Sequence, residues 1–344
     1  MIRLVSDEKN TYFCTEKRED ETMKRTFWKE LLWLLIYVAV GLLLTAGVMA
    51  VVMDAAYRDI ESGPTAAVPG FFATGIHWPG LWEMSGTACL LHAVQWAQTL
   101  LLMLLPPLLW ARIYIKVRAR DVFGLHLPSV RWMLWVGCVM VASLPLMDWL
   151  VTACQHLPLP TALAAVADGQ MATQRAMLEP MLSPSGPVGW AELILLMAVA
   201  TAVGEELMFR GALLRLLRGG YLAQTLRSER EERRNRHASA ILVGLVFALI
   251  HFDLYGLVPR WLLGTFFVYL VYWTGSLWPS VLAHALNNLF ALVEYKMAPD
   301  EASSEALLGG DPWLVAASVI TTALLLYAEG RWRKDMNGIR NKLS

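Results

Sequence analysis

Charge is scarce in this chain of 344 residues: charged side chains make up 17% of it, hydrophobic ones 56%, and the formal net charge is zero. A neutral chain with neither a basic stripe nor interleaved aromatics lacks the electrostatic footprint of a nucleic-acid-binding protein. The sequence also contains no internal repeat, no low-complexity tract and no stretch that resembles a soluble domain. We therefore expect no nucleic-acid partner and one polytopic helical domain.

Cysteine is rare too, and its spacing excludes two common roles. No two cysteines form a CxxC pair, so a disulfide framework or a zinc knot is not expected. Three of the four fall within or at the ends of long apolar runs, where buried and inert thiols are predicted. The cysteines are Cys14, Cys89, Cys138 and Cys154.

Long hydrophobic runs are abundant. A helix crosses the hydrocarbon core of a bilayer with about 20 apolar residues, and the sequence offers eight candidate runs, of which the sixth is short. The predicted fold is therefore all-α, a polytopic bundle of about eight transmembrane helices in a lipid bilayer. The expected spans are Leu31–Met53, Met84–Ala111, Trp132–Ala153, Ala191–Leu217, Ala238–Leu257, Trp261–Gly275, Leu277–Val293 and Pro312–Ala328.

Lysine and arginine gather at both ends of the chain and in alternate loops, which predicts that both termini lie in the cytoplasm. We expect a polar N-terminal segment at 1–27, a membrane domain at 28–330 and a basic tail at 331–344. The segments 54–83 and 155–190 carry the proline, glycine and serine typical of connectors and are predicted to be external loops. With a short sixth span and no organelle signal, the expected location is a bacterial inner (plasma) membrane.

Two adjacent acids, Glu205 and Glu206, interrupt the run Ala191–Leu217, and Arg210 lies one turn further along. Insertion scales put the cost of a charged Asp, Lys or Arg at the centre of a membrane helix at roughly 2.5–3.5 kcal/mol. The i,i+4 spacing lets Glu206 pair with Arg210, whereas adjacent residues point about 100° apart around a helix. We expect one glutamate to face a cavity and the other to be held by Arg210 or by a group on a neighbouring helix.

Three polar residues on other expected spans lie at a similar depth. At 1.5 Å per residue, Glu205 lies about 18 Å and His251 about 20 Å from the cytoplasmic ends of their spans, and His284 and Asn288 lie at about 12 and 18 Å. A carboxylate and an imidazole that meet in a partly dry cavity can activate water. A second histidine with an asparagine supplies donors for an oxyanion. This set of residues predicts an amide hydrolase.

These residues also form a family pattern. Gly204–Gly211 (GEELMFRG) resembles the EExxxR motif of the CAAX-protease and bacteriocin-processing (CPBP) family, which includes the type II CAAX prenyl endopeptidases. Phe247–His251 (FALIH) resembles the second motif, FxxxH, and His284–Asn288 (HALNN) resembles the third, in which Asn or Asp follows His by four residues. The three motifs occur in the family's order on separate expected helices. The resemblance covers roughly 190–292, the expected catalytic core.

The resemblance implies intramembrane proteolysis of a membrane protein or of a prenylated or otherwise lipidated peptide. By analogy with the family, Glu205 and His251 would activate the water, His284 and Asn288 would stabilise the oxyanion, and Glu206 with its arginine partner would order the site. The family was long described as metalloproteases. Here an HExxH pair is missing and the histidines and glutamates are spread over three helices, so the sequence favours a metal-free, glutamate-type reaction over a zinc-dependent one.

Two other classes stay open. An ion-coupled transporter also buries acids and histidines, although repeated halves or paired broken helices are not visible. A non-catalytic membrane scaffold or immunity protein would keep the motifs without turnover, and a Glu205→Gln change would separate it from a protease. Presenilin-type and serine-type intramembrane proteases fit worse, because Leu308–Asp311 lacks the first glycine of GxGD and no Gly-x-Ser-x-Gly surrounds Ser276.

Overall fold

The computed structural model describes the backbone of residues 4–61, 74–218, 229–297 and 308–343. Over these residues the chain is mostly helical, as the apolar runs predict. The exception is a small antiparallel hairpin of β1 (Ile76–Trp78) and β2 (Trp82–Met84), which turns at Gly80 with a φ of 73°. This hairpin lies in a segment that was expected to be an external loop.

Two of the long helices contain π-helical segments, in which each turn holds an additional residue. The first such helix comprises α3 (Gly86–Ala97), η1 (Gln98–Leu104), α4 (Leu105–Leu109) and η2 (Trp110–Ile115). The second comprises α8 (Gly186–Leu193), η3 (Ile194–Ala200), α9 (Thr201–Glu206), η4 (Leu207–Leu213) and α10 (Leu214–Leu217). The other helices are α1 (Leu4–Glu61), α5 (Ala119–Phe123), α6 (Val130–Gln155), α7 (Thr161–Met181), α11 (Glu229–Leu249), α12 (Leu257–Thr274), α13 (Trp278–Met297) and α14 (Pro312–Leu343).

Five helical stretches in the described part of the chain are long and apolar enough to cross a membrane. The protein is therefore a helical bundle of the integral membrane type. The remaining expected spans fall on α11, α12 and α13, which length and composition do not mark as spans, so the count of eight and the orientation of the termini stay predictions. The five stretches are Phe27–Ala55, Gly86–Ile115, Val130–Gln155, Gly186–Leu217 and Pro312–Trp332.

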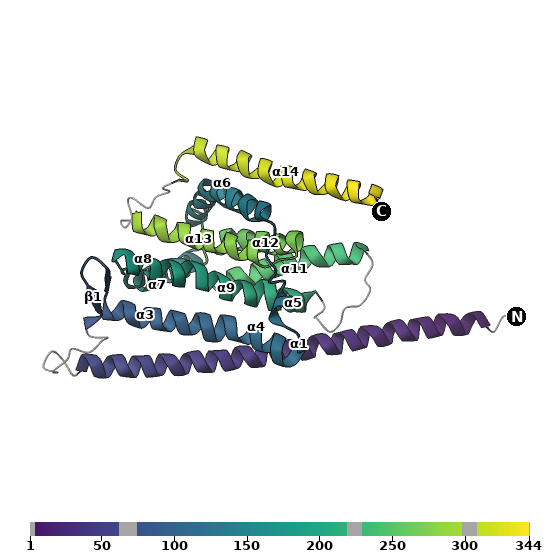
Figure 1. Cartoon of the computed structure of the whole chain (residues 1–344), viewed down its shortest axis with the longest axis horizontal. Helices are drawn as coiled ribbons and strands as arrows, with labels where there is room; N and C mark the ends of the chain where they lie inside the picture. The colour runs from purple at the N-terminus through teal and green to yellow at the C-terminus, as the bar shows by residue number, and fades with distance from the viewer. Residues whose placement is uncertain (1–3, 62–73, 219–228, 298–307, 344) are drawn as a thin grey trace.

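The long helices lie side by side in layers, with α1 at one side of the bundle, α14 at the other, and α6 between α13 and α14; both chain ends lie toward the same end of the bundle (Figure 1). Among them α13 is central, because it packs against α6, α9, α12 and η3. The helix α1 runs without a break through residue 27, where the N-terminal segment was expected to end. The side of α13 that faces these four elements is therefore covered by other helices.

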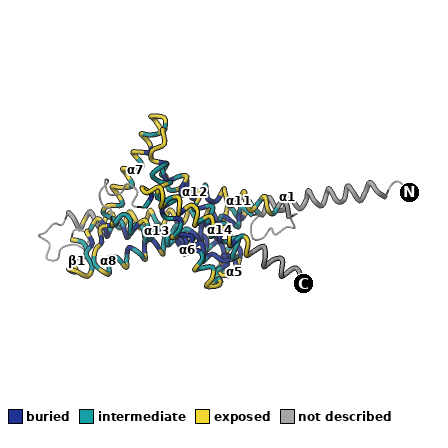
Figure 2. Tube along the Cα trace, turned by 90° about the horizontal axis from the view of Figure 1, so that it is seen from above, coloured by how far each residue is buried: buried dark blue, intermediate teal, exposed yellow. Residues whose placement is uncertain are grey.

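Two sequence expectations are wrong in detail. The segment 155–190 contains a helix, α7, because it is rich in alanine, leucine, methionine and glutamine, which favour helix, and follows Pro160. This helix stands out from the rest of the bundle, and most of its residues are exposed or half-buried (Figure 2). The expected span Ala238–Leu257 ends early, at Leu249, since Phe252 adopts a φ of 48° and Asp253 accepts a hydrogen bond from the Gly256 amide in a turn.

The expected break between the sixth and seventh apolar runs coincides with a break between two helices. The helix α12 ends at Thr274, and Gly275 follows it with a φ of 69°, in the left-handed region that favours glycine. The next helix, α13, begins three residues later at Trp278.

Candidate functional site

Both glutamates lie on α9, the short α-helical piece between the π-helical segments η3 and η4. Such wide turns recur at functional sites because they redirect side chains relative to a regular helix. Gly204, directly before the pair, allows close packing against η1: a Cβ there would lie 3.1 Å from the Met103 Cβ and 3.4 Å from the Thr99 carbonyl oxygen. The helix that carries the acids is thereby held against its neighbour.

Glu206 is completely buried, and both of its carboxylate oxygens are engaged. The Arg210 Nη1 donates to Oε1 at 2.8 Å, and the His284 Nδ1 lies 2.9 Å from the same oxygen. The Ser280 hydroxyl donates to Oε2. With three partners from two helices and no contact with solvent, this carboxylate is held in one position.

Arg210 is also buried, at 1% exposure, and α12 supplies its second partner. Its Nη2 donates to the Gly264 carbonyl at 2.9 Å. Its guanidinium lies over two aromatic rings, 4.5 Å from the Phe247 centroid and 5.3 Å from the Phe267 centroid. Such cation–π contacts stabilise a cation more when water is excluded.

Close helix packing brings these partners together. A Cβ at Gly244 of α11 would lie 2.3 Å from the Thr265 Oγ1 and 2.7 Å from the Thr265 amide nitrogen. A Cβ at Gly264 of α12 would lie 3.1 Å from the Gly244 Cα. The two glycines therefore let α11 and α12 approach at backbone distance, and this approach places Phe247 against the arginine.

Glu205 differs from its neighbour. Its side chain is 15% exposed, and its Oε2 is shielded from solvent yet accepts no hydrogen bond from the residues that the structure describes. The His284 Nε2 lies 3.7 Å from that oxygen. Since Nδ1 of the same ring binds Glu206, the His284 imidazole lies between the two carboxylates. Glu205 is the one acid of the pair with a free oxygen directed at an imidazole.

His251 lies in the loop that follows α11. Its Nδ1 lies 2.7 Å from the Phe247 carbonyl oxygen. A carbonyl only accepts hydrogen bonds, so Nδ1 carries a proton and Nε2 of the neutral ring is left as an acceptor. The Phe247 ring connects the two histidines, with centroid distances of 4.8 Å to His251 and 5.6 Å to His284.

Asn288 lies one turn after His284 on α13. Its Nδ2 donates to the Met197 carbonyl of η3 at 3.2 Å, so the amide ties α13 to the helix of the glutamates. The Asn287 Nδ2 lies 3.5 Å from the Asn288 Oδ1. The side-chain NH2 group of Asn288 has two hydrogens, so one remains for another acceptor after the hydrogen bond to Met197. The structure thus brings Glu205, Glu206, Arg210 and His284 into direct contact range and places His251 and Asn288 beside them.

The helix α7 holds the loop that carries His251. The Gln170 Oε1 accepts a hydrogen bond from the Leu254 amide at 3.2 Å, and the Asp168 Oδ1 accepts one from the Tyr255 hydroxyl at 2.9 Å. The Gln174 Nε2 lies 3.5 Å from the carbonyl oxygen of His251 itself. A segment expected to be a connector therefore constrains a candidate catalytic loop.

Sequence reasoning missed several partners of the site. Ser280 precedes His284 by four residues, so the i,i+4 rule applied backwards would have placed it on the same face. Phe267, whose ring stacks on His284 at a centroid distance of 5.5 Å, carried no such signal. In the described residues no group of three His, Cys, Asp or Glu side chains is arranged to hold a metal ion.

Fold and site together define a helical membrane protein with a buried polar centre of acids, imidazoles and one arginine. Residues 187–290 match the protein-family model described as Type II CAAX prenyl endopeptidase Rce1-like. The predicted resemblance to the CPBP family is thereby confirmed over this segment, and the match supports a CAAX-type intramembrane protease at the level of the family. No curated protein matches the chain, and no solved structure matches it.

Proposed function

We propose that this protein is an intramembrane endopeptidase in which Glu205 removes a proton from the attacking water. The observation that carries the proposal is the difference between the two acids. Glu206 has three partners and no solvent contact, whereas Glu205 has a buried, unpartnered oxygen beside an imidazole. A general base must keep a lone pair free for the proton that it accepts.

In the proposed reaction, water lies between the Glu205 Oε2 and the His251 Nε2. Glu205 accepts one proton as the water oxygen bonds to the scissile carbonyl carbon, and His251 orients the water through its free acceptor. The carbon–nitrogen bond then breaks, and the proton held by Glu205 passes to the leaving amine. The products are a carboxylic acid and an amine, and at neutral pH the acid gives up its proton and the amine takes one up, so that they leave as carboxylate and ammonium.

His284 and Asn288 are proposed to stabilise the oxyanion. The Nδ1 of His284 donates to a carboxylate, so its Nε2 donates as well only when the imidazole is protonated on both nitrogens. The amide of Asn288 has a second hydrogen beside the one given to Met197. Preorganised donors of this kind contribute roughly 2.7–4 kcal/mol each to lowering a barrier.

Glu206 and Arg210 are proposed to act as positioning residues. The arginine holds the carboxylate, and the carboxylate holds the His284 ring through Nδ1. This series of contacts is analogous to the hydrogen bonds by which other proteins fix a histidine ring in one tautomer and orientation. Neither residue needs to touch the substrate.

The proposed substrate is a membrane-associated peptide, and the match to the CAAX prenyl endopeptidase model favours a prenylated C-terminus. The other classes considered, a transporter and a non-catalytic scaffold or immunity protein, predict no peptide product. A bacterial inner membrane stays the predicted location.

The test uses the purified full chain in proteoliposomes with a prenylated peptide and the same peptide without its lipid. Mass spectrometry of new termini identifies the cleaved bond. We expect cleavage by the wild type, a large loss in His251→Gln, and normal cleavage in Glu294→Gln, a matched control that removes a half-buried glutamate of α13 outside the site. Cleavage that persists in His251→Gln would contradict the proposed role of this residue.

A further inference from the structure

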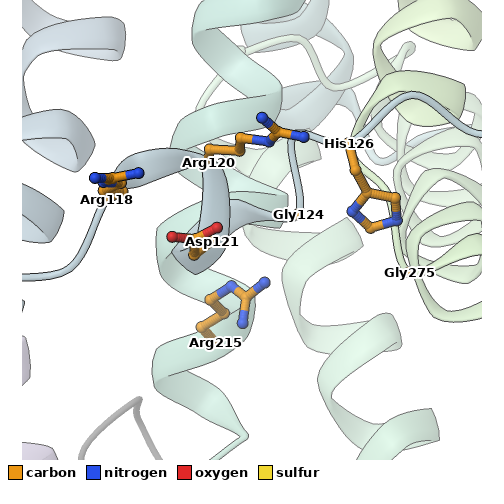
Figure 3. A pocket seen from close by; sticks show the side chains of 7 residues that line it. All are labelled: Arg118, Arg120, Asp121, Gly124, His126, Arg215 and Gly275. Atoms are coloured by element: carbon orange, nitrogen blue, oxygen red, sulfur yellow. The ribbon is translucent and has the colours of Figure 1, made fainter.

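A second site lies apart from the glutamates. A cavity of about 480 Å³ opens between α5, the loop that follows it, α10 and the end of α12, toward the end of the bundle at which both chain termini lie (Figures 1 and 3). Arg215 of α10 lines it, about 15 Å beyond Glu205 at the rise of a helix. No residue of the candidate active site lines this cavity.

The frame of the cavity is fixed by backbone contacts. The loop after α5 pairs with the connection between α12 and α13: the Leu277 amide donates to the Gly124 carbonyl at 3.1 Å, and the Ser276 hydroxyl donates to the His126 carbonyl at 2.6 Å. Gly124 has a φ of 65°, and a Cβ there would lie 2.5 Å from the Gly275 carbonyl oxygen. The backbone around the cavity is therefore held in place by these contacts.

The side chains around the cavity are mainly basic. Arg118, Arg120 and Arg215 come from two separate elements, His126 adds an imidazole, and Asp121 is the one acid of the lining (Figure 3). The charged side chains of the lining are thus three arginines and one aspartate, and Arg118 and Arg120 alone outnumber the carboxylate. The cavity also lies on the side that the lysine and arginine distribution predicts to be cytoplasmic.

We propose that this cavity binds a phosphate group, supplied either by the headgroup of an anionic lipid or by a soluble phosphorylated compound. The planar fork of arginine donates two parallel hydrogen bonds to phosphate oxygens, so several arginines around one cavity suit this group. Basic pockets between membrane helices at the cytoplasmic surface are typical sites for phosphate-bearing headgroups.

The test uses the full chain in phosphatidylcholine nanodiscs. One arm titrates inorganic phosphate and glycerol 3-phosphate and measures binding by calorimetry. The other arm adds a minor fraction of phosphatidic acid to the nanodiscs and measures the shift in melting temperature. The variants are Arg120→Gln, whose side chain is exposed, and Arg215→Gln. The matched control is Arg112→Gln, which removes an exposed arginine of η2 outside the cavity.

Loss of one charge-assisted pair should weaken binding by about tenfold or more. Binding of the soluble phosphates that falls in Arg120→Gln and Arg215→Gln but not in Arg112→Gln supports a soluble ligand. A stabilisation that requires phosphatidic acid and disappears in the same two variants supports a lipid headgroup. Absence of both effects, or an equal loss in Arg112→Gln, overturns the proposal. Because Arg120 is exposed, Arg120→Gln tests the site even if Arg215→Gln fails to fold.

Discussion

His284 of α13 and Glu206 of α9 are joined by a short contact, with 2.9 Å between Nδ1 and Oε1. The contact fixes the orientation of the imidazole, so that its other nitrogen, Nε2, faces Glu205 at 3.7 Å. Two adjacent acids in the sequence therefore lie on opposite nitrogens of one ring. The EExxxR and HxxxN motifs are linked through this ring.

The first prediction concerns the buried Glu206–Arg210 pair. Removing the arginine in Arg210→Met leaves a buried carboxylate without its cation, and breaking a buried pair in this way costs about 3–5 kcal/mol. We expect a large fall in the free energy of unfolding, measured by denaturation in detergent micelles. The exposed-site change Arg112→Met should leave stability near the wild-type value. Equal stability of the two variants would mean that the pair does not support the fold.

The second prediction concerns the glycine contact between α11 and α12. Gly244→Ala places a Cβ within 2.9 Å of the Trp261 carbonyl oxygen and closer still to Thr265, so the helices must separate. Overpacking of this kind costs about 1–3 kcal/mol. Activity should fall as well, because Phe247 and the Gly264 carbonyl both hold Arg210.

The control for that change is Gly137→Ala on α6, where a Cβ would meet nothing within 4 Å. Alanine favours helix over glycine by about 1 kcal/mol, so this variant should be as stable as the wild type or more stable. Thermal unfolding and cleavage rate, measured on both variants, decide the point. A Gly244→Ala protein that behaves like Gly137→Ala would contradict the proposed close packing.

The third prediction concerns the contact of α7 with the loop that carries His251. Gln170→Ala removes the acceptor for the Leu254 amide, and loss of one hydrogen bond worth about 1 kcal/mol loosens the loop. We expect kcat to fall about fivefold on that energy scale, with melting temperature and KM unchanged. Thr173→Ala is the matched control, because its hydroxyl binds only its own helix, at the Gly169 carbonyl. A fall in kcat of equal size in the control would assign the effect to α7 as a whole.

The fourth prediction concerns metal dependence. In the proposed reaction Glu205 removes the proton without a Lewis acid, so prolonged incubation with a chelator should leave the cleavage rate unchanged. The measurement is the rate before chelation, after chelation and after addition of zinc. A loss of activity that zinc restores would contradict the metal-free reaction.

The sequence predicted those features that depend on local patterns. Uninterrupted apolar runs determine where most helices lie, and the i,i+4 spacing of Glu206 and Arg210 placed them in contact, as the structure shows at 2.8 Å. It also predicted that the two glutamates would differ in environment. Both conclusions follow from helix geometry, which does not depend on tertiary packing.

The features that the sequence did not predict depend on contacts between distant segments. The helix α11 ends at Leu249 because a turn follows it. In this turn the Gly256 amide donates to Asp253, and the Leu254 amide donates to Gln170 of α7, which lies 84 positions earlier in the chain. The role of Gly264 as a hydrogen-bond acceptor for Arg210 depends on how α12 packs against η4. Spacing within one helix gives no information on either contact.

The most direct test of the account compares Glu205→Gln with Glu206→Gln for cleavage rate and unfolding on the same preparations. Glutamine keeps the shape of glutamate but accepts no proton from water at neutral pH. We predict that Glu205→Gln unfolds like the wild type and produces no detectable cleavage, whereas Glu206→Gln is markedly less stable because Arg210 loses its buried counter-ion. Wild-type cleavage by a correctly folded Glu205→Gln protein would show that Glu205 is not the base.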